Sequence, residues 1–363
     1  MFTSKIGFSG QWKADPTLVP SLQRQLAAPY RFHSTTPQAF MQLTPVAQYT
    51  NMTNMIVNNT RALREIIRLL GKQPEATRMY QIPSDILPLK QYKFTEWIYS
   101  HHSINDMIIN TLMGIRTLAR HNGVRLFMQT RPFTNISSED ENIAAAAIAD
   151  IESHARLAHL MGFSGSCIPE GFCLITNVNA QQDPQLKRTA RRANSKLSEH
   201  ARNIIVFKNN CITTSIGDLL SKQFTPTISG KSELTDFPLA IDLHAVWVKM
   251  NALLYPWSEV HQYVYSTWRG HKPISLYSQP DNTNWPPYSP HTVLNRHSIY
   301  GSSQPCPFSD KDLSKRSKYL WNLRQNKSVA LHLEYSDILV EAKANNLAQM
   351  QFYDFLEYNG FVT

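Results

Sequence analysis

Eight short apolar segments alternate with segments of helical periodicity, and this alternation restricts the fold more than any other feature of the chain. The apolar segments lie at residues 5–8, 78–82, 124–128, 173–175, 204–207, 239–242, 273–277 and 338–340. A continuous apolar run of this length is typical of a strand that is buried on both faces of a parallel sheet. Eight such strands with helices between them predict an α/β fold, a (β/α)8 TIM barrel whose chemistry collects at the carboxyl ends of the strands.

The segments between the strands predict helices and two long insertions. Helices are expected over 50–70, 104–119, 137–161, 185–201, 311–331 and 347–355. Ser137, with Asp140 three residues later, is the predicted capped start of the third of these helices. The helix over 185–201 is basic, and its charged face is either solvated or directed at phosphate. We treat 1–363 as one barrel domain, with a proline-rich insertion over 11–48 and a long loop over 279–308 after the seventh strand.

Composition favours an acidic partner and excludes several function classes. The chain has 36 Lys and Arg against 27 Asp and Glu, a net charge of +9 that is compatible with a polyanion, nucleic acid first. Glycine is scarce, at 13 residues, and no glycine-rich phosphate loop is present. Four cysteines without a CxxC pair indicate reduced thiols. The chain has no 18-residue apolar window and no apolar leader, so we expect an intracellular protein with no membrane helix.

Four blocks of sequence, taken in order, resemble one known family. They are RMYQIPSDILPL (78–89), SHARLAHLMG (153–162), TWRGHKP (267–273) and DILVEAK (337–343). These blocks resemble the patterns YRISSDLFPL, ExHARLLxLMG, TWKGRRP and DxMVEAK of the UV-damage endonucleases, and the resemblance extends over roughly residues 5–358. It implies a TIM barrel that nicks DNA 5′ to photoproducts. The family uses a cluster of divalent metals at the strand ends, which generates hydroxide and neutralises charge on the phosphate.

Set against the family pattern, most of the implied metal-ligand positions carry other residues. Candidate ligands remain at Asp242, His244, His297 and Glu341. The replaced positions are Tyr92, Arg131, Thr176, Lys208, Ala245 and Leu276, where the resemblance implies histidine, glutamate or lysine. A cluster of metals needs many hard or borderline ligands that converge on one point. The resemblance therefore implies a metal site that is mostly dismantled, and no catalytic residue is assigned.

Two of the replacements, Arg131 and Lys208, are cations. A cation beside a divalent metal is repelled in a partly buried site, whereas carboxylates that have lost a metal need compensating positive charge. We therefore expect Lys208 or Arg131 to pair with Asp242 or Glu341, and we expect no metal cofactor. If nuclease activity remains, the remaining ligands would hold a divalent ion such as Mn²⁺ or Zn²⁺.

Several residues near the strand ends are candidates for contact with nucleic acid. They are Phe8, Trp12, Arg131, Thr134, Asn135 and Lys343. Thr134 and Asn135 stand where the resemblance implies a glutamine and an aromatic residue that probe the lesion. Phe8 either stacks on a base or fills the mouth of the barrel.

The sequence favours a catalytically degenerate barrel that binds DNA or serves a structural role. One alternative is an active metal-dependent DNA repair endonuclease with a reduced metal site. A second alternative is a scaffold subunit of a larger assembly, for example a viral one, with protein partners and no role in nucleic acid binding. A DNA-binding barrel should bind DNA less tightly as the salt concentration rises, because phosphate contacts release counterions. Weak binding with little salt dependence would favour the scaffold subunit.

Overall fold

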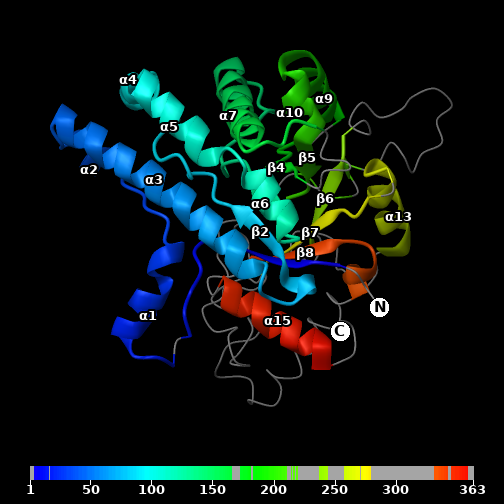
Figure 1. Cartoon of the computed structure of the whole chain (residues 1–363). Helices are drawn as coiled ribbons and strands as arrows, with labels where there is room; N and C mark the ends of the chain where they lie inside the picture. Colours follow the sequence, from blue (N-terminus) through cyan, green and yellow to red (C-terminus); the bar gives the residue numbers. More distant parts are fainter. Residues whose placement is uncertain are drawn as a thin grey trace, which may run out of the picture.

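Eight parallel strands form a closed barrel in chain order (Figure 1). The computed structural model describes residues 4–15, 17–165, 172–180, 183–210, 214, 216, 218–219, 237–243, 257–269, 271–278, 331–341 and 345–358. The strands are β1 (Ile6–Ser9), β2 (Met79–Ile82), β3 (Arg125–Gln129), β4 (Leu174–Asn177), β5 (Ile205–Lys208), β6 (Leu239–Asp242), β7 (Ile274–Ser278) and β8 (Asp337–Glu341). The predicted fold class is confirmed, and every predicted strand lies within two residues of an observed one.

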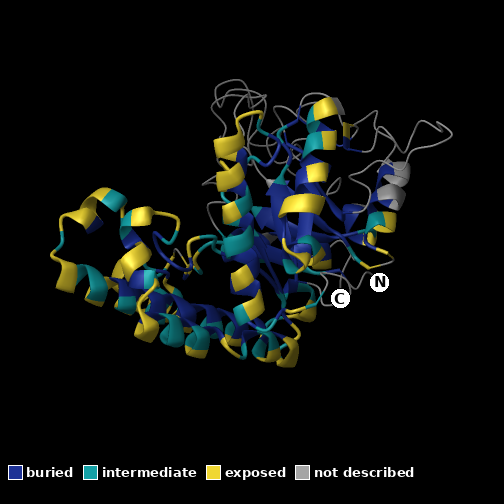
Figure 2. Ribbon diagram, turned by 90° about the horizontal axis from the view of Figure 1, so that it is seen from above, coloured by how far each residue is buried: buried dark blue, intermediate teal, exposed yellow. Residues whose placement is uncertain are grey.

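The middle residues of the strands are mostly apolar because both faces of each strand are buried. In β8 the four residues from Asp337 to Val340 are buried, and only Glu341 at the end is partly exposed. Figure 2 shows the buried strands enclosed by helices whose exposed faces point outward. The β1–β8 pairing, with Ile6 opposite Ile338, closes the barrel.

The helices that surround the barrel are α3 (Pro45–Leu70), α4 (Glu96–Tyr99), α5 (His102–Leu112), α6 (Ile115–His121), α7 (Glu141–Leu160), α9 (Asp183–Lys196), α10 (Glu199–Ile204), α13 (Trp257–Thr267) and α15 (Asn346–Tyr358). Short 3-10 helices are η2 (Glu75–Thr77), η3 (Lys93–Thr95) and η6 (Leu331–Glu334). None of the described helices is long and apolar enough to span a membrane.

The predicted helices differ from the structure at several boundaries, and α3, for example, begins at Pro45 and not at residue 50. The helix expected over 104–119 is two helices, because Gly114 adopts a left-handed φ of 82° between them. Asp140, and not Ser137, caps α7: its carboxylate accepts the N–H of Asn142 at 2.7 Å. The basic helix also divides, and Ser198 caps the second part by accepting the N–H of Ala201.

The proline-rich segment contains helices of its own. They are α1 (Pro20–Ala27), η1 (Ala28–Tyr30) and α2 (Pro37–Met41), and together with the start of α3 they extend outward from the barrel (Figure 1). Three prolines in this segment occupy the first helical position, where the missing N–H is not needed and the proline φ suits the helix. The predicted loop over 279–308 lies outside the described residues, as does the predicted helix over 311–331 except for its last residue, Leu331, which begins η6.

The amino end of the barrel is held together by a buried ion pair. Arg125 at the start of β3 donates to the carboxylate of Asp337 at the start of β8, which also accepts the backbone N–H of Lys5 at 2.7 Å. The guanidinium lies 5.6 Å from the centroid of the Trp268 ring. These contacts join three strands at the end opposite to the rim described next.

Candidate functional site

At the carboxyl rim of the barrel, an ion pair joins the last residues of β5 and β6. Lys208 Nζ lies 3.3 Å from Asp242 Oδ2, and the two side chains are only 10% and 15% exposed. The backbone of Asp242 is held as well, because its N–H donates to Asn209 Oδ1 at 2.8 Å and its carbonyl accepts from Asn209 Nδ2 at 3.1 Å. The expectation that a replacement cation pairs with a remaining acid is confirmed for Lys208.

Glu341, the other described acid of the predicted site, is the last residue of β8. Its carboxylate accepts a hydrogen bond from an uncharged side chain. Gln129 Nε2, at the end of β3, donates to Glu341 Oε1 at 2.8 Å and lies 3.1 Å from Gln81 Oε1 on β2. The three side chains come from strands that lie close together around the barrel. Their convergence is a consequence of the closed topology.

Arg131, the second replacement cation, forms no ion pair with Asp242 or Glu341 in the part of the chain that the structure describes. Its guanidinium forms an ion pair with Asp150 of α7, and its Nη2 donates to Gln91 Oε1 at 3.0 Å. Asp150 also accepts from Thr134 Oγ1 at 2.6 Å. This acid was missed by the sequence reasoning. One feature of the sequence could have indicated it: Asp150 is a carboxylate on the buried face of a helix, between Ala147 and Ile151.

The remaining replaced positions offer little metal chemistry. Thr176 is buried, and its hydroxyl accepts from Thr130 Oγ1 at 3.0 Å. Leu276 is fully buried in β7. Tyr92 is exposed at 38% and stacks on Phe94 with ring centroids 5.1 Å apart. His244, Ala245, His297 and Lys343 lie outside the described residues.

The aromatic candidates for nucleic-acid contact are less accessible than the sequence suggested. Phe8 is fully buried with its ring 5.0 Å from that of Tyr80, so it fills the barrel. Trp12 is partly buried and lies 4.9 Å from the ring of Tyr30. Phe133, which the sequence reasoning did not select, is 83% exposed.

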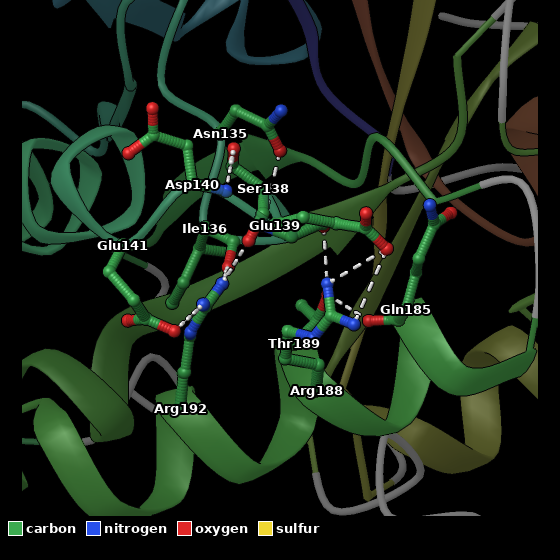
Figure 3. Close-up of polar contacts among 11 residues, drawn as sticks. Asn135, Ile136, Ser138, Glu139, Asp140, Glu141, Gln185, Arg188, Thr189 and Arg192 are labelled. Atoms are coloured by element: carbon green, nitrogen blue, oxygen red, sulfur yellow. Dashed lines mark hydrogen bonds and ion pairs between the residues drawn. The ribbon is translucent and has the colours of Figure 1, made fainter.

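The loop that carries Thr134 and Asn135 is held from below by α9 (Figure 3). Arg192 Nη1 donates to the carbonyls of Ile136 and Ser138 at 2.8 and 2.6 Å. Its Nη2 donates to Glu141 Oε1 at 2.6 Å. The Arg192 side chain is only 9% exposed, so this residue of the basic helix neither faces solvent nor reaches phosphate. It positions the loop.

Positive charge gathers beside this loop. Burial lowers the pKa of Lys90 to about 8, and the nearby guanidinium groups of Arg156 and Arg131 contribute to the decrease. Burial also lowers the pKa of His154, although the carboxylate of Asp150 opposes this change. His154 is therefore neutral near pH 7, and the surplus charge here comes from Lys90 and the two arginines.

Two of the four candidate metal ligands, Asp242 and Glu341, lie in the part of the chain that the structure describes. Among the described residues, no three His, Cys, Asp or Glu side chains come together in a way that could hold a metal ion. Of the two described acids, Asp242 has an ammonium partner and Glu341 has an amide partner.

A closed parallel barrel with its polar side chains at the carboxyl rim places the chain among the TIM barrels. The sequence matches the model of the UV-endonuclease UvdE family over residues 27–361, and the chain belongs to this family. Its fold is similar to the crystal structure of SacUVDE, with a TM-score of 0.69 and 15% identity over 99% of this chain and all of the other. Endonuclease IV from Thermus thermophilus gives a TM-score of 0.47 and 9% identity over 82% of this chain and 94% of the other. No curated protein sequence matches the chain.

Proposed function

We propose that this member of the UV-endonuclease family binds DNA but lacks the metal-dependent cleavage of the family. The observation that supports this most directly is the Lys208 ammonium 3.3 Å from Asp242, at the rim where the family resemblance implies metal ligands. The ammonium supplies Asp242 with the positive charge that a metal would otherwise supply.

The magnitude of the charge conflict supports the same conclusion. With an effective dielectric constant of about 20, an ammonium about 4 Å from a divalent cation raises the energy by about 8 kcal/mol. Metal binding at Asp242 therefore requires Lys208 to move away or to lose its proton. Glu341 is in a different position, because its partner Gln129 is neutral and repels no metal.

Two observations favour DNA as the binding partner. The chain belongs to an endonuclease family, and its net charge of +9 suits a polyanion. Surface cations that contact phosphates supply affinity even where no reaction follows.

The test combines metal analysis, cleavage and binding on the full chain. The purified protein is dialysed against Mn²⁺ or Zn²⁺, analysed for bound metal, and incubated with UV-irradiated and undamaged DNA. We expect substoichiometric metal, no nicks, and DNA binding that weakens steeply with salt. Stoichiometric metal with nicking that Glu341→Gln abolishes would instead establish an active endonuclease with a reduced site. Absent or salt-insensitive DNA binding would favour the scaffold.

A further inference from the structure

We propose that Lys90, Arg131 and Arg156 form an anion site that takes a backbone phosphate of a DNA strand at the outer edge of the rim. This inference rests on the proposed DNA binding and assigns it a place on the molecule. The three cations come from the loop after β2, the residues after β3, and α7. Arg131 contacts Asp150 of α7 and Gln91, the residue that follows Lys90, and the charges of Arg156 and Arg131 both act on Lys90, so the three cations lie near one another.

The charges at this place do not balance. Asp150 is engaged by Arg131, by Thr134 Oγ1 at 2.6 Å and by His154 Nδ1 at 3.5 Å. Lys90 and Arg156 add positive charge near Arg131, and among the described residues the charges that act on Lys90 are these two guanidinium groups and no carboxylate. In the part of the chain that the structure describes, neither Lys90 nor Arg156 has an ion pair or a side-chain hydrogen bond.

Lys90 is the most informative member of the site. Its side chain is partly buried, and taking an ammonium out of water without a partner costs free energy. Two guanidinium groups increase that cost, as the lowered pKa of Lys90 shows. A bound phosphate would remove the cost, because it supplies negative charge and several acceptor oxygens to one ammonium and two guanidinium groups.

Exposed aromatic rings beside the cations favour a nucleic acid strand over a free phosphate. Tyr92 follows Gln91 in the chain and is 38% exposed, while Phe133 lies two residues after Arg131 and is 83% exposed. A cationic groove with adjacent aromatic side chains is the usual arrangement for binding single-stranded or unstacked nucleic acid, since bases stack on the rings.

Substitutions of Lys90 and Arg156 test the site directly, whereas Arg131 is unsuitable because its removal would leave Asp150 without a guanidinium. Lys90→Met and Arg156→Gln are compared with Arg120→Gln, an exposed arginine on α6 at the opposite end of β3. Each test variant should bind DNA about five to ten times more weakly at about 0.1 M salt, and the slope of log K against log salt should fall by about 1. The Arg120→Gln control should match the wild type.

Stability and chemical reactivity give independent readouts. Lys90→Met removes a poorly solvated charge, so its urea midpoint should rise while its DNA affinity falls. Near the lowered pKa of about 8, the amine of Lys90 should be acylated faster than other lysines, and DNA should protect it. Concentrated inorganic phosphate should protect it as well, though less strongly.

The outcomes separate this inference from the proposed function. If the wild type binds DNA but the Lys90 and Arg156 variants keep its affinity and salt slope, the site is refuted while DNA binding stands. If the wild type does not bind DNA, the proposed function fails, and protection of Lys90 by phosphate then decides whether the anion site exists. Unchanged acylation in both DNA and phosphate would overturn the site.

Discussion

The ion pair between Lys208 and Asp242 should be energetically coupled, and a double-mutant cycle measures the coupling. At 3.3 Å and an effective dielectric constant of about 20, the attraction is about 5 kcal/mol. The cost of removing both charges from water offsets a large part of this value, because the side chains are only 10% and 15% exposed. We therefore expect a net coupling of about 2 kcal/mol.

Each single variant leaves one charge without its ion-pair partner in a poorly solvated place. Lys208→Met should lower the free energy of unfolding by about 3 kcal/mol, and Asp242→Asn should cost a similar amount. The double variant should lose much less than the sum, since neither charge remains. Urea unfolding followed by circular dichroism and by tryptophan fluorescence measures the four proteins of the cycle.

The exposed pair Glu65 and Arg68 on α3 provides the matched control. Its side chains are 36% and 49% exposed, so its coupling should not exceed about 0.5 kcal/mol and should vanish in about 0.5 M salt. The coupling of Lys208 with Asp242 should persist in that salt, because partly buried pairs are screened less. A coupling at the rim no larger than that of the control pair would refute the idea that Lys208 neutralises Asp242.

Three further predictions follow from the same structure. Lys208→Glu places a second carboxylate beside Asp242, so its melting temperature should fall below that of the wild type and rise again with Mn²⁺, while the wild type shows no such dependence. Asp337→Asn breaks the buried pair with Arg125 and should cost about 3 kcal/mol in urea unfolding, with unchanged DNA affinity because the pair lies at the opposite end of the barrel. Burial lowers the pKa of His261 from 6.5 to about 4 and that of His332 well below 6.5. Below pH 6.5 the unfolded chain therefore binds protons that the folded chain refuses, and stability should fall as the pH drops from 6.5 towards about 4. The His332→Gln variant should lose less stability than the wild type over this pH range. An equal loss in the two proteins would contradict the conclusion that burial lowers the pKa of His332.

The strands could be predicted from the sequence because their burial is simple. Both faces of each strand are covered, so the apolar run is continuous and its length matches the strand. The proline-rich segment was harder to interpret. Pro20, Pro37 and Pro45 signal a break in regular structure and also suit the first turn of a helix. The residues that follow Pro20 and Pro37 form short helices with little or no buried surface. The sequence there has no strong apolar periodicity, so it does not show whether the proline interrupts regular structure or begins a helix.

The candidate site was predictable only where strand topology alone decides the contact. Lys208 and Asp242 end neighbouring strands, so any closed barrel brings them together. The partner of Arg131 depends instead on how α7 packs over the loop after β3. The sequence does not show which residue of α7 lies opposite Arg131. Arg192 shows the same limit. Its helix is basic, yet the angle at which α9 lies under the loop turns this arginine inward to the carbonyls of Ile136 and Ser138.

The two proposals together explain how a barrel of this family could keep its partner without its reaction. A metal cluster concentrates positive charge at one point, which both attracts a phosphate and activates water against it. Here Lys208 is paired with Asp242, while Arg131 lies at the outer edge near Lys90 and Arg156. Cations distributed in this way attract phosphate and release counterions, but none of them lowers the pKa of a bound water as a metal does. Binding and catalysis should therefore separate, and substitutions at the outer edge should change the salt dependence of DNA binding while substitutions of Lys208 and Asp242 change mainly stability.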